Sequence, residues 1–162
     1  MLPAACLERL VRADLIIHAG DVADTDTLRM LRSFGIPLIA VKGNVDPADL
    51  DLPAAAGIDV DGTTVAVVHN GGAEAGRLAR MRTRFPDAGL VIFGHSHIPL
   101  LERADDGFTI LNPGSPTDRR KQPRHTMAEV LIEAGRPPVV AFFSVDDPAG
   151  PLDPELVRGG AR

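Results

Sequence analysis

The 162-residue chain is long enough for one domain with a substantial core and too short for two comfortable ones. Its hydrophobic fraction of 44% and charged fraction of 24% are ordinary for a globular protein, and its net charge of −5 argues against sequence-independent binding to long nucleic acid. No apolar run is long enough to span a membrane, and the N-terminus does not match a signal peptide. The lone Cys6 excludes an internal disulfide. From these observations we expect a cytoplasmic protein.

The first half of the chain alternates between helix-forming segments and short apolar runs. Pro3 lies in the first turn of the first expected helix, but no Ser, Thr, Asp or Asn precedes it as a cap. Asp24 is placed to cap the second helix, which Gly35 closes. The pattern predicts helices over residues 2–11 and 25–34, and strands over residues 15–18 and 38–41.

Strands and hairpins dominate the second half. Asp61-Gly62 and Asp105-Asp106-Gly107 each separate two apolar runs, a pattern that is typical of β-hairpins. The pattern predicts one helix over residues 73–85, and strands over residues 58–60, 64–68, 90–93, 100–103, 108–111, 126–132 and 139–145. We therefore expect an α/β fold, a sandwich of mixed β-sheets flanked by helices, over residues 1–145, and a flexible C-terminal tail over residues 146–162.

Side chains of the types that bind metals follow four of the predicted strands. They are Asp21, Asn44, His69, His95 and His97. In open α/β sheets the ligand crevice lies at the carboxyl ends of the strands. Taken singly, each residue also fits an ordinary turn or a buried histidine, but together they predict a metal centre. Because His95 and His97 are two apart in a segment expected to be extended, we expect both rings to face one cluster.

The ligand types narrow the chemistry that such a centre performs. Carboxylate, amide and imidazole groups suit two divalent ions, with manganese favoured and zinc, iron or nickel as alternatives. Two ions would activate water to attack phosphorus in a small phosphate ester and stabilise the charge that develops. His18 and Asp46 lie in the same loops and are expected to support the ligands. No acid or base is assigned, because Val45 leaves its loop without a titratable group at that position.

Two other segments have weaker interpretations. The basic segment formed by residues 119–121, Arg124 and His125 is either a solvated loop or an aid in positioning a phosphate. The glycine-rich residues 71–76 lack the Lys and the Ser or Thr of a nucleotide-binding P-loop, so that interpretation fails.

Short motifs occur along the chain in a distinctive order: Gly20-Asp21, Gly43-Asn44-Val45-Asp46, His69-Asn70, Gly94-His95-Ser96-His97 and the Asn-Pro-Gly-Ser of residues 112–115. In this order they resemble the calcineurin-like metallophosphoesterases, specifically their small bacterial and archaeal phosphodiesterase branch. Asn70 departs from the glycine that the family usually has there. The resemblance implies hydrolysis of a phosphodiester or phosphomonoester. It also implies that Asp21 bridges two ions, that Asn44, His69 and His95 complete one ion's ligands, and that His97 binds the other.

The family's first strand and its Asp-x-His motif have no counterpart before Pro3, so we expect a fold without that strand. Three interpretations stay open at this point. The sequence belongs to a longer protein, or it folds with a single metal and has weak or no hydrolysis, or it is a non-catalytic scaffold or interaction protein. A homo-oligomer is compatible with each of them.

Overall fold

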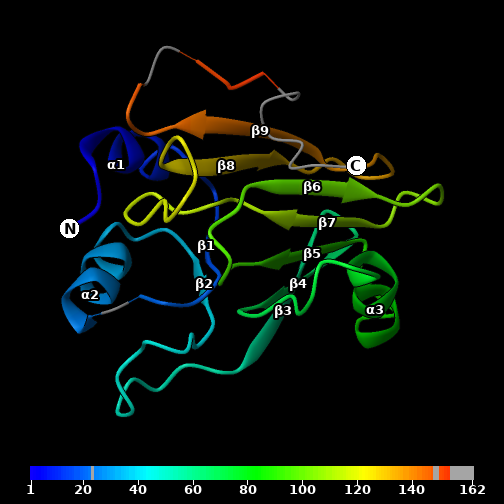
Figure 1. Ribbon diagram of the computed structural model, residues 1–162, viewed down its shortest axis with the longest axis horizontal. Coiled ribbons are helices and arrows are strands. Elements are labelled where there is room, and N and C mark those ends of the chain that lie inside the picture. The colour runs from blue at the N-terminus through cyan, green and yellow to red at the C-terminus, as the bar shows by residue number, and fades with distance from the viewer. Residues whose placement is uncertain (23, 148–149, 154–162) are drawn as a thin grey trace.

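Two β-layers and three helices make up the part of the chain that the structure describes, residues 1–22, 24–147 and 150–153 of a computed structural model (Figure 1). The larger layer is a five-stranded sheet with the strand order β3-β4-β5-β7-β6. Its central strands β4, β5 and β7 are parallel, and β3 and β6 pair antiparallel at the two edges. The bounds are β3 (Ala55–Val60), β4 (Thr63–Val68), β5 (Leu90–Phe93), β6 (Leu100–Arg103) and β7 (Thr109–Asn112).

The second layer contains two smaller sheets. β1 (Ile16–His18) pairs in parallel with β2 (Leu38–Ala40), and β8 (Thr126–Leu131) pairs antiparallel with β9 (Val139–Ser144). Buried side chains from both layers meet in the main core, which contains Val41, Val65, Val67, Leu90, Ile92, Leu111 and Phe142. The fold is therefore the predicted α/β sandwich of mixed sheets.

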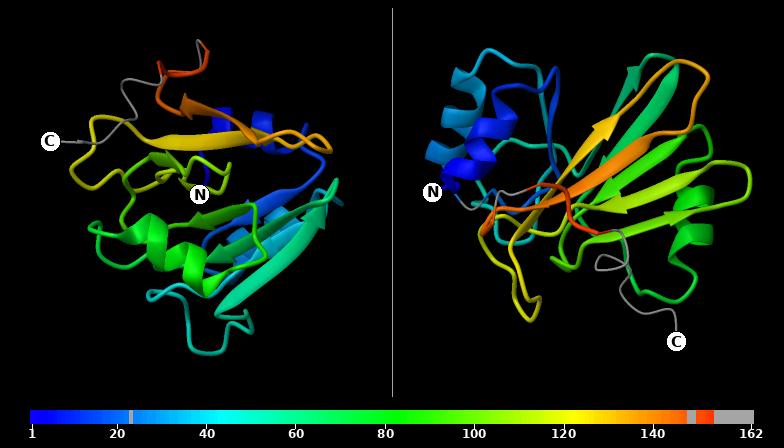
Figure 2. Two further views of the ribbon diagram at one scale, coloured as in Figure 1. Left: turned by 90° about the vertical axis from the view of Figure 1, so that its right-hand side faces the viewer. Right: turned by 90° about the horizontal axis from the view of Figure 1, so that it is seen from above.

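Helices cover the outer faces of the two layers (Figure 2). α1 (Ala4–Leu10) packs against the β8–β9 sheet through Cys6, and α2 (Thr25–Ser33) packs beside β2 through Leu28. α3 (Arg77–Arg84) packs on the outer face of the five-stranded sheet through Met81. Cys6 is only 3% exposed, and burial raises the pKa of its thiol to about 11.

Two of the short-range signals in the sequence have the structures that they predict. The Asp24 side chain accepts a hydrogen bond from the backbone N–H of Thr27 at 2.6 Å and so caps α2. Asp61 and Gly62 join β3 to β4 with φ values of 47° and 77°, the left-handed pair that a tight hairpin turn requires. α1 begins after Pro3 without a side-chain cap, as expected.

The start predicted for the third helix, at residue 73, is wrong. α3 begins at Arg77, because Gly72 and Gly76 adopt φ values of 70° and 68° that no right-handed helix contains. The segment before the helix is held from the helix itself: Arg77 donates to the backbone oxygen of Gly72 at 3.1 Å, and Arg80 donates to that of Ala75 at 2.6 Å.

Part of the predicted C-terminal tail lies against the fold. Pro151 forms a bridge with Phe143 of β9, and the Leu152 N–H donates to the backbone oxygen of Phe142 at 2.7 Å. Backbone pairing and the apolar Leu152 side chain thus attach residues 150–153 to the sheet, while the flexibility expected of the tail stays a prediction. The remainder of that prediction, for residues 148–149 and 154–162, falls outside the residues described, and the domain boundary at residue 145 stays a prediction. No helix within the described ranges is both long enough and apolar enough to cross a membrane.

Candidate metal centre

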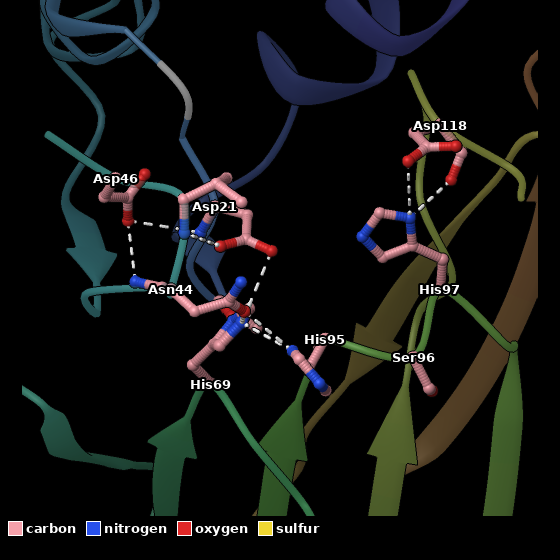
Figure 3. Close-up of polar contacts among 12 residues, drawn as sticks. Asp21, Asn44, Asp46, His69, His95, Ser96, His97 and Asp118 are labelled. Atoms are coloured by element: carbon pink, nitrogen blue, oxygen red, sulfur yellow. Dashed lines mark hydrogen bonds and ion pairs between the residues drawn. The ribbon is translucent and has the colours of Figure 1, made fainter.

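Strand pairing brings four of the predicted ligands together. β1 runs parallel to β2, and β4 runs parallel to β5, so the loops after these strands leave each sheet in one direction. The two layers stack with these ends side by side, and Figure 3 shows the four side chains converging. We call this set the inner group; it consists of Asp21, Asn44, His69 and His95.

The ligand atoms of the inner group lie close enough to share one ion. His69 Nε2 lies 2.8 Å from Asn44 Oδ1 and 3.1 Å from His95 Nδ1. Asp21 Oδ2 lies 3.3 Å from His69 Nε2 as well. Asp21, His69 and His95 form the one group of three or more Asp, Glu, His or Cys side chains, among the residues described, whose ligand atoms all lie within 4.8 Å of one another.

A backbone contact decides which nitrogen of His69 faces the other ligands. Nδ1 lies 2.8 Å from the carbonyl oxygen of Ala19, which only accepts, so Nδ1 carries the proton and donates it. Nε2 of the neutral ring is then a lone pair that faces Asn44 Oδ1 and Asp21 Oδ2, two further acceptors. A cation between these three acceptors would relieve their repulsion, as would a proton on His95 Nδ1, which lies 2.8 Å from Asn44 Oδ1. The chemistry of the inner group therefore fits a divalent ion.

Asp46 joins the two loops that carry Asp21 and Asn44. Its Oδ2 accepts hydrogen bonds from the backbone N–H groups of Gly43 at 2.6 Å and Asp21 at 3.2 Å. Asp21 Oδ1 in turn accepts from the N–H of Val45 at 3.0 Å. A Cβ atom on Gly43 would lie 2.1 Å from the backbone nitrogen of Asp21, so the loops approach as closely as glycine permits. Asp46 lies behind the ligands and holds their loops together.

Burial keeps two histidines at the site in the neutral form. It lowers the pKa of His95, and the neighbouring His69 and Arg120 lower that pKa further, against the opposite effect of Asp21. The neutral ring is the form that binds a metal. Burial also lowers the pKa of His18, whose Nδ1 has no hydrogen-bond partner among the residues described. The supporting role expected for His18 stays a prediction.

His97 lies apart from the inner group and turns toward Asp118 (Figure 3). Its Nδ1 lies 2.6 Å from the backbone oxygen of Asp118 and 3.4 Å from Oδ2 of the same residue. We call His97 and Asp118 the outer pair. Because the carbonyl oxygen only accepts, Nδ1 of the neutral ring donates and Nε2 is left as the lone pair that a metal would use.

The extended conformation expected for residues 95–97 is wrong. His95 and His97 have φ values of 64° and 58°, because the chain turns there and the Ser96 N–H donates to the backbone oxygen of Gly94 at 2.8 Å. The two rings therefore do not face one cluster. That His97 binds a second ion remains a prediction.

Two residues with a part in this arrangement were not identified from the sequence. Asp118 directly precedes the basic segment and is exposed, so nothing in the pattern marks it as the partner of His97. Asn112 begins the Asn-Pro-Gly-Ser segment, which signals a turn but not the role of its side chain. The Asn112 amide is fully buried and contacts the loop that carries His95.

The surroundings of the inner group combine positive charge with exposed apolar side chains. Arg120 is exposed, follows the outer pair in sequence and is close enough to lower the pKa of His95. Val45 and Ile98 directly follow Asn44 and His97 in the chain, and they are 60% and 40% exposed. These groups offer contacts to an anion and to an apolar substituent.

Comparison with known proteins gives matches over most of the chain. The family profile of the calcineurin-like phosphoesterase superfamily domain matches residues 1–135. A probable metallophosphoesterase from Methanocaldococcus jannaschii is 35% identical over 120 residues, which are 72% of this chain and 60% of the relative. This chain thus spans less than two thirds of that relative's length.

Solved structures share the architecture. Wild-type Vps29 of Entamoeba histolytica, solved in complex with zinc, superimposes with a TM-score of 0.77 at 21% identity, covering 91% of this chain and 85% of that one. A protein described as a novel archaeal phosphodiesterase has a TM-score of 0.60 at 20% identity, covering 77% of this chain and 81% of that one. At these identities the likeness establishes the fold alone.

Proposed function

The chain belongs to the calcineurin-like phosphoesterase superfamily, and from this premise we propose that it hydrolyses phosphodiester bonds in a small substrate with the help of divalent metal ions. One observation carries the proposal: Asp21, Asn44 and His69 direct oxygen and nitrogen atoms of the kinds that bind metals toward one point. A cation satisfies all of them at once. Manganese is the ion we favour for this mixed oxygen and nitrogen set, with zinc, iron or nickel as alternatives.

Bound divalent ions would supply a water nucleophile at neutral pH and stabilise negative charge on phosphate oxygens. The residues of the chain have separate tasks in the proposal. Asp21 contributes the negative charge of the inner group, and His69 is held by Ala19 in the tautomer that binds metal. His97 holds its lone pair ready for a second ion through its bond to Asp118. Because Val45 has no titratable group, any proton for the leaving group would have to come from elsewhere, and we propose water.

We favour a diester over a monoester as the substrate. A diester carries two organic substituents, and Val45 and Ile98 place exposed apolar surface next to two of the ligands. Arg120 offers a positive charge to the remaining phosphate oxygen. The resemblance to the fold of an archaeal phosphodiesterase supports the same choice.

Hydrolysis with added manganese tests the proposal. The chain should hydrolyse bis-p-nitrophenyl phosphate faster than p-nitrophenyl phosphate, and a chelator should abolish turnover of both. His95→Ala removes one inner ligand and should lower the rate to background without unfolding the protein, as circular dichroism would check. Turnover that persists in His95→Ala, or that is indifferent to the chelator, contradicts the proposal.

The separation of the outer pair favours a second candidate, a single-metal protein that binds a partner without turnover. In that case calorimetric titration with manganese finds one bound ion per chain, and no phosphate ester is hydrolysed. Two bound ions together with hydrolysis support the enzyme instead.

A further inference from the structure

We propose that Asn112 is a positioning residue whose buried amide fixes the imidazoles of both His95 and His97. The inference rests on the metal centre of the proposed function, and it assigns a role to a side chain that touches neither the metal nor the substrate. Asn112 is the last residue of β7 and is 0% exposed, so its amide contacts only other protein groups.

The amide nitrogen of Asn112 holds the turn that carries the histidines. Nδ2 donates to the backbone oxygen of Gly94 at 2.8 Å and to Ser96 Oγ at 3.0 Å. Gly94 and Ser96 flank His95, so these two bonds fix the chain on both sides of one inner ligand. Ser96 also lies between His95 and His97 in the chain, so the bond to its Oγ falls within the segment that carries both rings.

This turn needs support because its backbone is strained. His95 and His97 both adopt the left-handed conformation that non-glycine residues rarely occupy, with φ values of 64° and 58°. Such a conformation persists only where surrounding contacts outweigh its cost. The contacts here are the Gly94 N–H, which donates to the His69 backbone oxygen at 2.9 Å, and the two bonds from Asn112.

The amide oxygen of Asn112 leads to the outer pair. Oδ1 accepts a hydrogen bond from the Gly114 N–H at 2.9 Å, which begins the turn over residues 113–118. Ser115 Oγ then accepts from the N–H of Asp118 at 3.1 Å. The backbone oxygen of Asp118 is the group that binds Nδ1 of His97. One buried amide therefore reaches His95 through its nitrogen and His97 through its oxygen.

Asparagine meets requirements that similar side chains do not. The oxygens of Gly94 and Ser96 need donors, and the Gly114 N–H needs an acceptor. The short side chain of asparagine supplies both kinds of group from one amide. Aspartate has no N–H groups for Gly94 and Ser96 and would bury a charge. Alanine leaves the donor and acceptor groups of both turns without this partner.

Metal affinity tests the inference independently of hydrolysis. The full chain is titrated with manganese and with zinc in a calorimeter, as the wild type, Asn112→Ala and Thr109→Val. Thr109 is the matched control because it lies on β7, is 0% exposed and donates from Oγ1 to the Gly107 backbone oxygen at 2.9 Å. Both variants lose a buried hydrogen-bonding group and should melt at lower temperature. Only Asn112→Ala should lose metal affinity, by at least about tenfold, the lower end of the usual effect of a residue that orients a ligand.

The milder variant Ser96→Ala decides the matter if Asn112→Ala does not fold. It removes one of the two acceptors of Asn112 Nδ2 and should weaken manganese binding by about threefold, a fraction of the loss expected for an orienting residue. An Asn112→Ala variant, or failing that a Ser96→Ala variant, with wild-type affinity for both metals overturns the inference. If the wild-type chain binds metal but hydrolyses no phosphate ester, the proposed function is contradicted and the role of Asn112 is left intact.

Discussion

The inner group and the outer pair hold their side chains in different ways. Inner ligands come from four loops that end strands of both layers, and the side chains of His69 and Asp21 are only 8% and 10% exposed. The outer pair depends on one exposed segment, where the Asp118 side chain is 61% exposed. Rigid strands orient the inner group before any ion binds, whereas a surface loop orients the outer pair. We therefore expect the first ion to bind more tightly than the second.

Removal of the carboxylate from the inner group has the largest expected effect. Asp21→Asn keeps the shape of the side chain but removes its charge, so metal affinity should fall by more than the roughly 10–100-fold that loss of a supporting residue causes. Calorimetric titration with manganese measures the change. An affinity within tenfold of the wild type contradicts the assignment of Asp21 as a ligand.

Removal of His97 separates the two regions directly. His97→Ala should eliminate the weaker of two manganese-binding events and leave the tighter one within about twofold, because it removes one ring and keeps the bonds of the Asn112 amide to Gly94 and Ser96. Hydrolysis should fall with the weaker event. If both binding events disappear together, the inner group and the outer pair are one cooperative site, and the distinction between them is wrong.

Acid should destabilise the metal-free protein through two partly buried histidines, His18 and His95. The folded state lowers the pKa of His18 and of His95, so the unfolded chain binds more protons once the pH falls below the ordinary histidine value of 6.5. The free energy of unfolding is then at its full value above pH 6.5 and decreases as the pH falls through the lowered pKa values. Urea denaturation between pH 7.5 and about 5 measures the slope, and His18→Asn should flatten it. An unchanged slope in that variant would exclude His18 as a cause.

Val45, the exposed apolar residue that follows Asn44, gives the smallest expected effect. Val45→Ser should raise KM for bis-p-nitrophenyl phosphate by about fivefold, because loss of roughly 40 Å² of apolar contact costs about 1 kcal/mol. Leu131→Ser is the matched control, since Leu131 is 58% exposed on β8 and Val45 is 60% exposed. Equal effects of the two substitutions would show that the substrate does not contact Val45.

Sequence patterns predicted the elements well because these depend on local signals, and the residues of the inner group lie together as expected, although their binding of a metal stays a prediction. Strand ends place Asp21 and His69 at the sheet edge, and the cap at Asp24 and the hairpin at Asp61-Gly62 form as expected. The direction of His97 was not predictable, since it follows from a left-handed backbone and from Asp118, 21 residues away. The start of α3 was missed because glycines at positions 72 and 76 adopt positive φ angles that residue type permits but does not require.

The buried thiol on the inner face of α1 has a practical consequence for the chain. Cys6 is the one cysteine in the sequence, and with a pKa of about 11 it stays protonated and unreactive near neutral pH. An Arg120→Cys variant would therefore carry a single labelling point on the exposed segment beside the metal centre. A fluorophore attached there would report how that segment moves when manganese is added, with no second dye to confuse the signal.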